Sequence, residues 1–182
     1  QESGVKRFVY ASSSSVYGLK FEDNVHEGMS LDPLTDYSRF KADCEVILNK
    51  YMSNDFTVCT LRPATVCGYS RRQRLDVIVN ILTNHAFCHN KIKIFGGEQK
   101  RPNIHIKDMV RAYLAVLASP SSKINGEIFN VGFENQTVRH LGEIVRKVVG
   151  SNVEMERVPT DDNRSYHISS EKIFKTIDFQ TK

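Results

Sequence analysis

The sequence predicts an α/β protein, because short strand-like runs alternate with stretches of helical periodicity along its 182 residues. Residues 5–11 (VKRFVYA) and 57–61 (TVCTL) are rich in β-branched and aromatic side chains, which is typical of buried strands. Residues 33–52 between them carry apolar side chains at spacings of three and four, namely Tyr37, Phe40, Cys44, Ile47 and Tyr51. A strand, a helix and a strand in this order favour a parallel crossover unit.

The same alternation continues to the end of the chain, less regularly in the second half. Asp108 is the expected N-cap of one helix, and Gly150 ends another, whose sequence is NQTVRHLGEIVRKVVG. The helix that Asp108 would cap covers residues 108–118, and further helices are expected at residues 76–87 and from Ser169 or Ser170. The expected strands cover residues 91–95, 103–106, 127–131 and 153–158.

The composition fits one globular domain. Apolar residues make up 40% of the chain and charged residues 25%, which is sufficient for a buried core. The longest apolar runs fall far short of the roughly 20 residues needed to cross a bilayer, so no membrane association is expected. Four cysteines without CxxC spacing favour reduced thiols and a cytoplasmic location: Cys44, Cys59, Cys67 and Cys88.

The net charge of +4 suits an anionic small ligand as well as nucleic acid. Basic residues cluster only at positions 71–74 and 100–101, and no aromatic platform or nucleic-acid module accompanies them, so nucleic acid is not an expected partner. His85, Cys88 and His89 share a helix face, but three such residues without a fourth ligand do not predict a metal site.

Tyr37 and Lys41, in DYSRFKAD, are one helical turn apart and therefore share a face. An ammonium group beside a phenol favours the phenolate, which can act as a general base. Taken alone, such a pair is more often a half-buried tyrosine beside a surface lysine. Its context is the serine run ASSSSVYG at residues 11–18, which directly follows a strand-like run.

Five segments resemble, in order and spacing, the extended short-chain dehydrogenase/reductase family, whose members epimerise or dehydrate nucleotide sugars. They are FVYASSSSVYG, DYSRFKADCEVIL, LRPATVCG, RPNIHIKDMVRAY and GEIFNVG. The resemblance implies the C-terminal part of a Rossmann-like doubly wound parallel sheet with a smaller mixed α/β substrate-binding lobe. Residues 1–68 would form the second half of the dinucleotide-binding domain, and residues 69–182 mainly the substrate-binding lobe, with some returning Rossmann elements.

The resemblance also implies a catalytic set and the cofactor NAD. Ser13 would hydrogen-bond the sugar hydroxyl, Tyr37 would remove its proton, and Lys41 would hold the nicotinamide ribose and stabilise the phenolate. The residues that would contact NAD are Ala11, Ser12, Ser13, Tyr37, Lys41, Pro63 and Ala64.

The chemistry implied is that of a UDP-sugar 4-epimerase. Related dehydratases carry an Asp-Glu pair after the catalytic hydroxyl, whereas this chain has Ser14 and Ser15, which are poor acids and bases. Decarboxylation or reduction of a keto-sugar, and a non-catalytic remnant that only binds a nucleotide sugar or a partner, stay open as alternatives.

By the same resemblance, a nucleotide-sugar substrate would be bound by residues spread over the chain. Thr65 stands where the 4-epimerases usually have asparagine, and Arg101 matches an arginine that pairs with a diphosphate. The full expected set is Ser13, Thr65, Arg72, Arg74, Asn80, Arg101, Asp162 and Arg164. Considered alone, each of the charged residues would more often be a solvated surface group.

The family's glycine-rich GxxGxxG turn, which receives the cofactor pyrophosphate, does not occur in this sequence. We therefore expect the sequence to be a fragment of a longer enzyme or a gene model that lacks its start. The resemblance also implies a homodimer for the full-length protein, formed through the helix that carries Tyr37 and a neighbouring helix that this sequence lacks.

Overall fold

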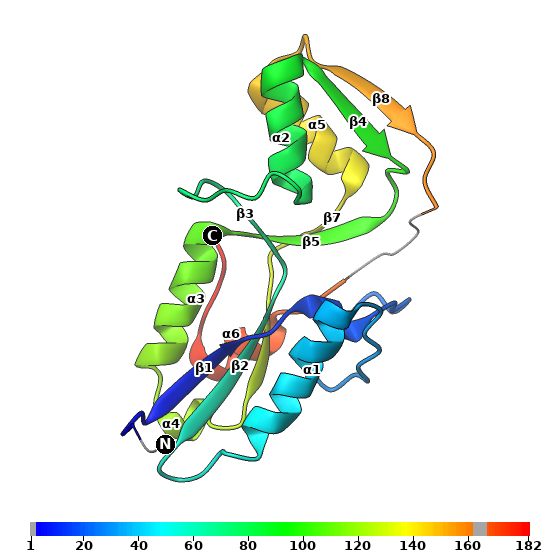
Figure 1. Cartoon of the computed structure of the whole chain (residues 1–182). Coiled ribbons are helices and arrows are strands. Elements are labelled where there is room, and N and C mark those ends of the chain that lie inside the picture. The colour runs from blue at the N-terminus through cyan, green and yellow to red at the C-terminus, as the bar shows by residue number, and fades with distance from the viewer. Residues whose placement is uncertain (1–2, 162–166) are drawn as a thin grey trace.

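A computed structural model describes residues 3–161 and 167–182. Strands β1 (Arg7–Ala11), β2 (Thr57–Pro63) and β6 (Ile128–Val131) form a parallel sheet in the order β1-β2-β6. Helices α1 (Asp36–Asn49) and α3 (Ile106–Ala118) lie on opposite sides of β1 and β2 (Figure 1). The expected α/β architecture with parallel strand pairing is therefore confirmed.

A second, smaller lobe has its own core. Strand β4 (Lys91–Phe95) pairs in parallel with β8 (Glu154–Val158), and helices α2 (Ile78–His89) and α5 (Val138–Val149) pack beside them (Figure 1). The buried apolar residues of this lobe are Leu82, Ala86, Ile92, Ile94, Val138, Leu141, Val145 and Val153. This core is separate from that of the β1-β2-β6 sheet, so the described residues form two packed bodies.

A third, three-stranded sheet runs between the two bodies. It pairs β3 (Thr65–Cys67) in parallel with β5 (Lys100–His105), and β5 antiparallel with β7 (Asn135–Thr137). The remaining elements are the 3-10 turn η1 (Ser14–Tyr17), α4 (Ser121–Ile124) and α6 (Glu171–Ile177). Strand β3 follows β2 after one residue, so the chain passes directly from the main sheet toward the small lobe.

Two local expectations are wrong. His105, not Asp108, is the N-cap of α3: its Nδ1 accepts a hydrogen bond from the Lys107 backbone N–H, and Asp108 pairs with Arg111 inside the helix. Residues 135–137, expected to open the following helix, form strand β7 instead, and Thr137 becomes the N-cap of α5. In both cases pairing with a distant strand sets the start of the helix.

The apolar stripe that identifies α1 as a helix lies on its outer side. Phe40 is 65% exposed and Ile47 50% exposed, whereas the residues that α1 buries are Ser38, Ala42 and Glu45. The stripe that predicts the helix is therefore not the side that packs against the sheet.

In the part of the chain that the structure describes, no helix has the length and apolar character required to span a membrane. The four cysteines are free thiols, and the cytoplasmic location that this usage favours stays a prediction.

Candidate functional site

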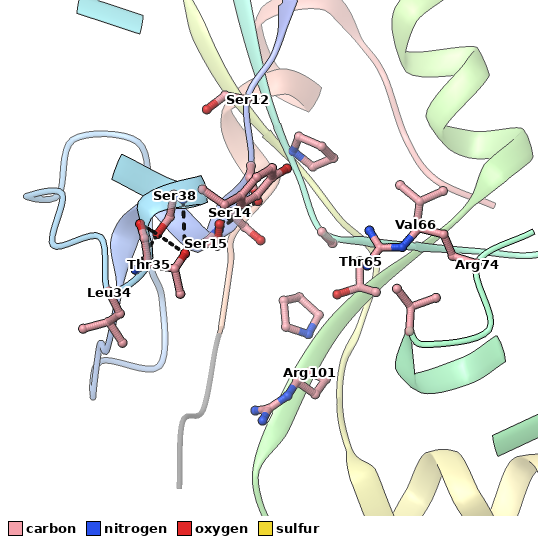
Figure 2. Close-up of a pocket in the computed structure, with 16 residues that line it drawn as sticks. Ser12, Ser14, Ser15, Leu34, Thr35, Ser38, Thr65, Val66, Arg74 and Arg101 are labelled. Carbon is pink, nitrogen blue, oxygen red and sulfur yellow. Dashed lines mark hydrogen bonds between the residues drawn. The ribbon is translucent and has the colours of Figure 1, made fainter. Parts of the chain in front are cut away.

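A cavity of about 630 Å³ lies at the carboxyl ends of β1 and β2. In open α/β sheets ligands bind at this end of the strands. Its lining residues are Ser12, Ser13, Ser14, Ser15, Leu34, Thr35, Tyr37, Ser38, Pro63, Ala64, Thr65, Val66, Arg74, Val77, Arg101 and Pro102. The serine turn and the start of α1 face Thr65 and Arg101 across the cavity (Figure 2).

The serine run is a structured turn. Ser13 is the N-cap of η1, and its Oγ accepts a hydrogen bond from the Ser15 backbone N–H at 3.2 Å and lies 2.9 Å from the Ser15 Oγ. Gly18 ends the turn with a φ of 68°, and a Cβ at this position would lie 1.9 Å from the backbone oxygen of Asp32. Only glycine fits there, so the backbone that presents the serines is closely constrained.

Tyr37 and Lys41 are placed by the first turns of α1. Tyr37 lines the cavity, and the Lys41 Nζ donates a hydrogen bond to the Ala11 carbonyl at 2.7 Å. The same Nζ lies 5.6 Å from the ring centre of Tyr37 and 5.1 Å from that of Tyr10. Burial raises the pKa of Tyr10, and a hydrogen bond with Cys44 adds to the shift, so Tyr10 stays a neutral phenol. The ammonium is therefore fixed at the end of β1, beside the exposed tyrosine.

The carboxyl end of β2 forms the facing wall. Pro63 ends the strand, the buried Ala64 donates its N–H to the Val131 carbonyl at 2.8 Å, and Thr65 begins β3. All three line the cavity, and their contact with a cofactor or a substrate stays a prediction.

Only some of the residues predicted to bind the substrate line the cavity. Arg74 and Arg101 line the cavity and also a neighbouring one of about 690 Å³, which α2, β4 and Val138 enclose. Arg74 forms an exposed ion pair with Asp76 at 2.6 Å, and hydrogen bonding with Arg74 lowers the pKa of Asp76. Arg72 is exposed and is not among the residues that line either cavity.

The amide group of Asn80 serves the loop before α2. Its Oδ1 accepts from the Gly68 N–H at 3.3 Å, and its Nδ2 donates to the Arg74 carbonyl at 2.8 Å. Asn80 therefore holds the backbone that carries Arg74 and does not itself line a cavity. Asp162 and Arg164 lie outside the described residues.

A buried polar network beneath the cavity was not predicted from the sequence. The Glu45 carboxylate and the Arg62 guanidinium form an ion pair at 2.6 Å, and the Arg62 Nη1 donates to the Tyr17 hydroxyl at 2.8 Å. Burial alone lowers the pKa of Arg62, but its hydrogen bonds with Glu45 and Tyr17 outweigh this effect and raise it, so the guanidinium stays charged. An arginine inside the apolar run TVCTLRP is the one sequence signal that could have indicated a buried partner.

The cavity is rich in hydroxyl groups and has two arginines at its far wall. No aspartate or glutamate occurs among the described residues that line it. This arrangement suits hydrogen bonding to a polyhydroxylated ligand, anion binding by Arg74 and Arg101, and proton transfer by a phenol.

Comparisons with known proteins agree with this arrangement. Residues 1–132 match the model of the NAD dependent epimerase/dehydratase family. An uncharacterized UDP-glucose epimerase of Bacillus subtilis is 34% identical over 82% of this chain and 47% of its own length, and the mouse dTDP-D-glucose 4,6-dehydratase is 29% identical over 94% and 50%.

Among solved structures, the UDP-glucuronic acid 4-epimerase of Bacillus cereus, in complex with UDP-glucuronic acid and NAD, matches with a TM-score of 0.83. Its sequence identity is 25%, and the match covers 97% of this chain and 56% of that one. The chain spans about half the length of the curated relatives it matches.

Proposed function

The chain belongs to the NAD dependent epimerase/dehydratase family, and from this membership we propose that it carries the catalytic residues of a nucleotide-sugar 4-epimerase. The observation that carries the proposal is one cavity that brings together the serine turn and Tyr37, with the Lys41 ammonium fixed beside the phenol ring. In the whole protein, residues 1–68 would complete the dinucleotide-binding domain, and residues 69–182 would mainly bind the sugar nucleotide.

The residues present fit the nicotinamide end of NAD. The Lys41 Nζ uses one of its three donors on the Ala11 carbonyl, which leaves donors for the hydroxyls of a ribose. Ser12, Pro63 and Ala64 supply a wall of small side chains at the ends of two parallel strands, where a flat ring can lie. Bound NAD would supply the hydride acceptor and donor that an epimerisation requires.

The residues of this chain would handle the proton and the orientation of the sugar. Ser13 and Tyr37 would hydrogen-bond the hydroxyl on the sugar carbon that is inverted. Tyr37 would take the hydroxyl proton as the hydride of that carbon passes to bound NAD, which leaves a planar keto carbon. The sugar then turns about its phosphate bonds, and Tyr37 returns the proton after the other face has been reduced. Lys41 would stabilise the developing phenolate, because its ammonium is hydrogen-bonded to the Ala11 carbonyl beside the Tyr37 ring.

The serine turn supports epimerisation over dehydration. Eliminating water from a sugar requires an acid and a base, and Ser14 and Ser15, which line the cavity, stand at the two sequence positions where related dehydratases have an Asp-Glu pair. The absence of a carboxylate from the described lining points the same way, although dehydratases are among the relatives of this chain.

Arg74 and Arg101 support a nucleotide diphosphate sugar as the substrate, and UDP-sugars are the first candidates, because relatives and structural neighbours are named for them. We also propose that a second copy pairs with the outer side of α1, where Phe40 and Ile47 are exposed.

The decisive experiment joins this chain to a glycine-rich N-terminal half and replaces Tyr37. Tyr37→Phe removes the hydroxyl and keeps the ring, so we expect turnover of UDP-glucose to fall by about 100-fold or more, the usual contribution of a general base. NAD and UDP-glucose affinities, measured by calorimetry, should stay unchanged. Tyr69→Phe, at an exposed tyrosine outside the cavity lining, is the matched control. Full activity of Tyr37→Phe would refute the assignment.

A further inference from the structure

We propose that the buried ion pair between Glu45 and Arg62 positions the three segments that form the catalytic cavity. Glu45 belongs to α1, Arg62 belongs to β2, and the pair also holds the serine turn through Ser12. Both are positioning residues, since neither lines the cavity. This inference rests on the proposed function and concerns the geometry on which that function depends.

The pair is bidentate and almost fully shielded from solvent. The Arg62 Nη2 donates to the Glu45 Oε2 at 2.6 Å, and the Arg62 Nε donates to the Glu45 Oε1 at 3.0 Å. Their side chains are 3% and 4% exposed. The Ser12 hydroxyl donates to the same Oε1. A bidentate arginine–carboxylate pair fixes orientation as well as distance, so the three groups form a rigid junction.

The junction continues through Tyr17 to Asn130 on β6. The Arg62 Nη1 donates to the Tyr17 hydroxyl at 2.8 Å, and Tyr17 donates to the Asn130 Oδ1 at 2.8 Å. The Asn130 Nδ2 in turn donates to the Val25 carbonyl at 3.2 Å. Among the described residues, the buried side-chain atoms without a partner are found elsewhere, at Asn103 and His167. The network is therefore closed, a condition under which buried polar groups rigidify a structure.

The serine turn, α1 and the end of β2 each contribute one residue to this junction, and each of these residues lies close in sequence to a residue that lines the cavity. Glu45 lies one helical turn after Lys41 and two turns after Tyr37 in α1. Ser12 directly precedes Ser13, and Arg62 directly precedes Pro63. The spacing between the serine hydroxyl, the phenol and the facing wall is thus set by one ion pair.

The function of the pair is geometric more than stabilising. Replacing a buried ion pair by apolar side chains of similar volume is often neutral or favourable for stability, because both charges no longer need to be desolvated. Catalysis, in contrast, is sensitive to small displacements, and a shift of about 1 Å costs about 100-fold in rate. The two effects can therefore be separated by experiment.

The test replaces both partners at once in the chain joined to a glycine-rich N-terminal half. Glu45→Leu with Arg62→Met removes one charge of each sign, so we expect a folded protein whose kcat for UDP-glucose falls by about 100-fold. KM and the pH profile should change little, because the net charge is kept and no substrate contact is lost.

The matched control is Glu127→Leu with Lys172→Met. This ion pair, at 2.7 Å, joins the start of β6 to α6 and is not part of the cavity lining. Its loss should leave kcat unchanged.

A second readout works on the chain alone and needs no activity. The Ser12 N–H donates to the Leu61 carbonyl at 2.8 Å, so its hydrogen exchange reports how firmly the serine turn is held. Exchange at residues 12–15 should accelerate in the Glu45→Leu/Arg62→Met variant, whereas exchange in β4 should not. Unchanged exchange, or a double variant that matches the parent in kcat, would overturn the inference. An inactive parent protein would instead refute the proposed function, and the exchange result would still decide the role of the pair.

Discussion

The contacts of Lys41 place its ammonium group beside the phenol ring of Tyr37. The lysine side chain reaches from α1 to the Ala11 carbonyl and passes beside the rings of Tyr10 and Tyr37. A lysine ammonium is a compact point charge with three donors, so it can serve a backbone oxygen and a ligand at the same time. The neighbouring Tyr10 keeps its proton because burial raises its pKa. Of these two phenols, Tyr37 is the one that lines the cavity, and we propose it as the group that transfers the proton.

The cysteines offer a residue-scale test of the packing. Burial raises the pKa of Cys59 to about 12, while Cys88 on α2 is exposed. At pH 8 only about one Cys59 thiol in ten thousand would be ionised, and the thiolate is the reactive form. We expect iodoacetamide to modify Cys88 readily and Cys59 only after unfolding in urea, as peptide mass spectrometry can measure. Equal labelling of both would contradict the packing of β2.

The raised pKa of Cys59 also makes the free energy of unfolding depend on pH, in a direction that can be stated. The folded pKa of Cys59 lies above the ordinary value of about 8.5 for an unfolded chain. Its stabilising contribution is therefore complete below pH 8.5 and is lost as the pH rises toward 12.

At the scale of one element, the N-terminus of α1 determines where Tyr37 points. Thr35 and Ser38 form a capping box: the Thr35 Oγ1 accepts from the Ser38 N–H at 3.2 Å, and the Ser38 Oγ accepts from the Thr35 N–H at 3.1 Å. Tyr37 lies between them in the first turn. A helix start fixed by two reciprocal bonds does not fray, and the phenol keeps its direction into the cavity.

Thr35→Ala removes one half of this box. We expect the free energy of unfolding, measured by urea denaturation, to fall by about 1 kcal/mol. Turnover should fall as well, under conditions in which the variant is fully folded, because the first helical turn becomes mobile. Thr35→Ser keeps the accepting oxygen and should behave like the parent protein. A Thr35→Ala variant with full turnover would show that the cap does not orient Tyr37.

At the scale of the whole molecule, the outer sides of two helices remain apolar and uncovered. Besides Phe40 and Ile47 on α1, the exposed residues include Val110, Leu114 and Leu117 on α3. These surfaces lie on opposite sides of β1 and β2 (Figure 1). Exposed apolar surface of this kind is usually an interaction site or a cause of aggregation.

Phe40→Glu with Ile47→Glu tests the proposed pairing through α1. Two carboxylates in an apolar contact would have to be desolvated, so we expect the double variant to sediment as a monomer at concentrations where the parent associates. Phe87→Glu, at a still more exposed position on α2, should leave the sedimentation coefficient unchanged. Association that survives the double substitution would exclude this face of α1.

Much of the fold follows from local patterns, whereas the cavity depends on contacts between distant residues. Strand β4 has the bounds expected from the sequence, since β-branched residues and Gly96 mark its limits. Strands β3 and β7 were not predicted, because each has three residues and exists through its pairing with β5. Helical spacing alone puts Tyr37 and Lys41 on one face, and their catalytic role stays a prediction.

The Glu45–Arg62 junction could not be predicted in the same way, because its two members are distant in the sequence and give no periodic signal. Helical periodicity would assign Phe40 and Ile47, not Glu45, to the buried side of α1. Likewise, only the folded loop reveals that the amide group of Asn80 is occupied by backbone groups.

The backbone of the serine turn has a consequence for how such proteins change their chemistry. Its path is held by the Ser13 cap, by Gly18 and by the network beneath it, and the Ser15 hydroxyl adds a contact with the Ser13 Oγ at 2.9 Å. Both side chains line the cavity, so two substitutions there would alter the available acids and bases without altering the fold. An epimerase and a dehydratase of this fold could therefore differ by few substitutions in this turn while the backbone keeps the same path.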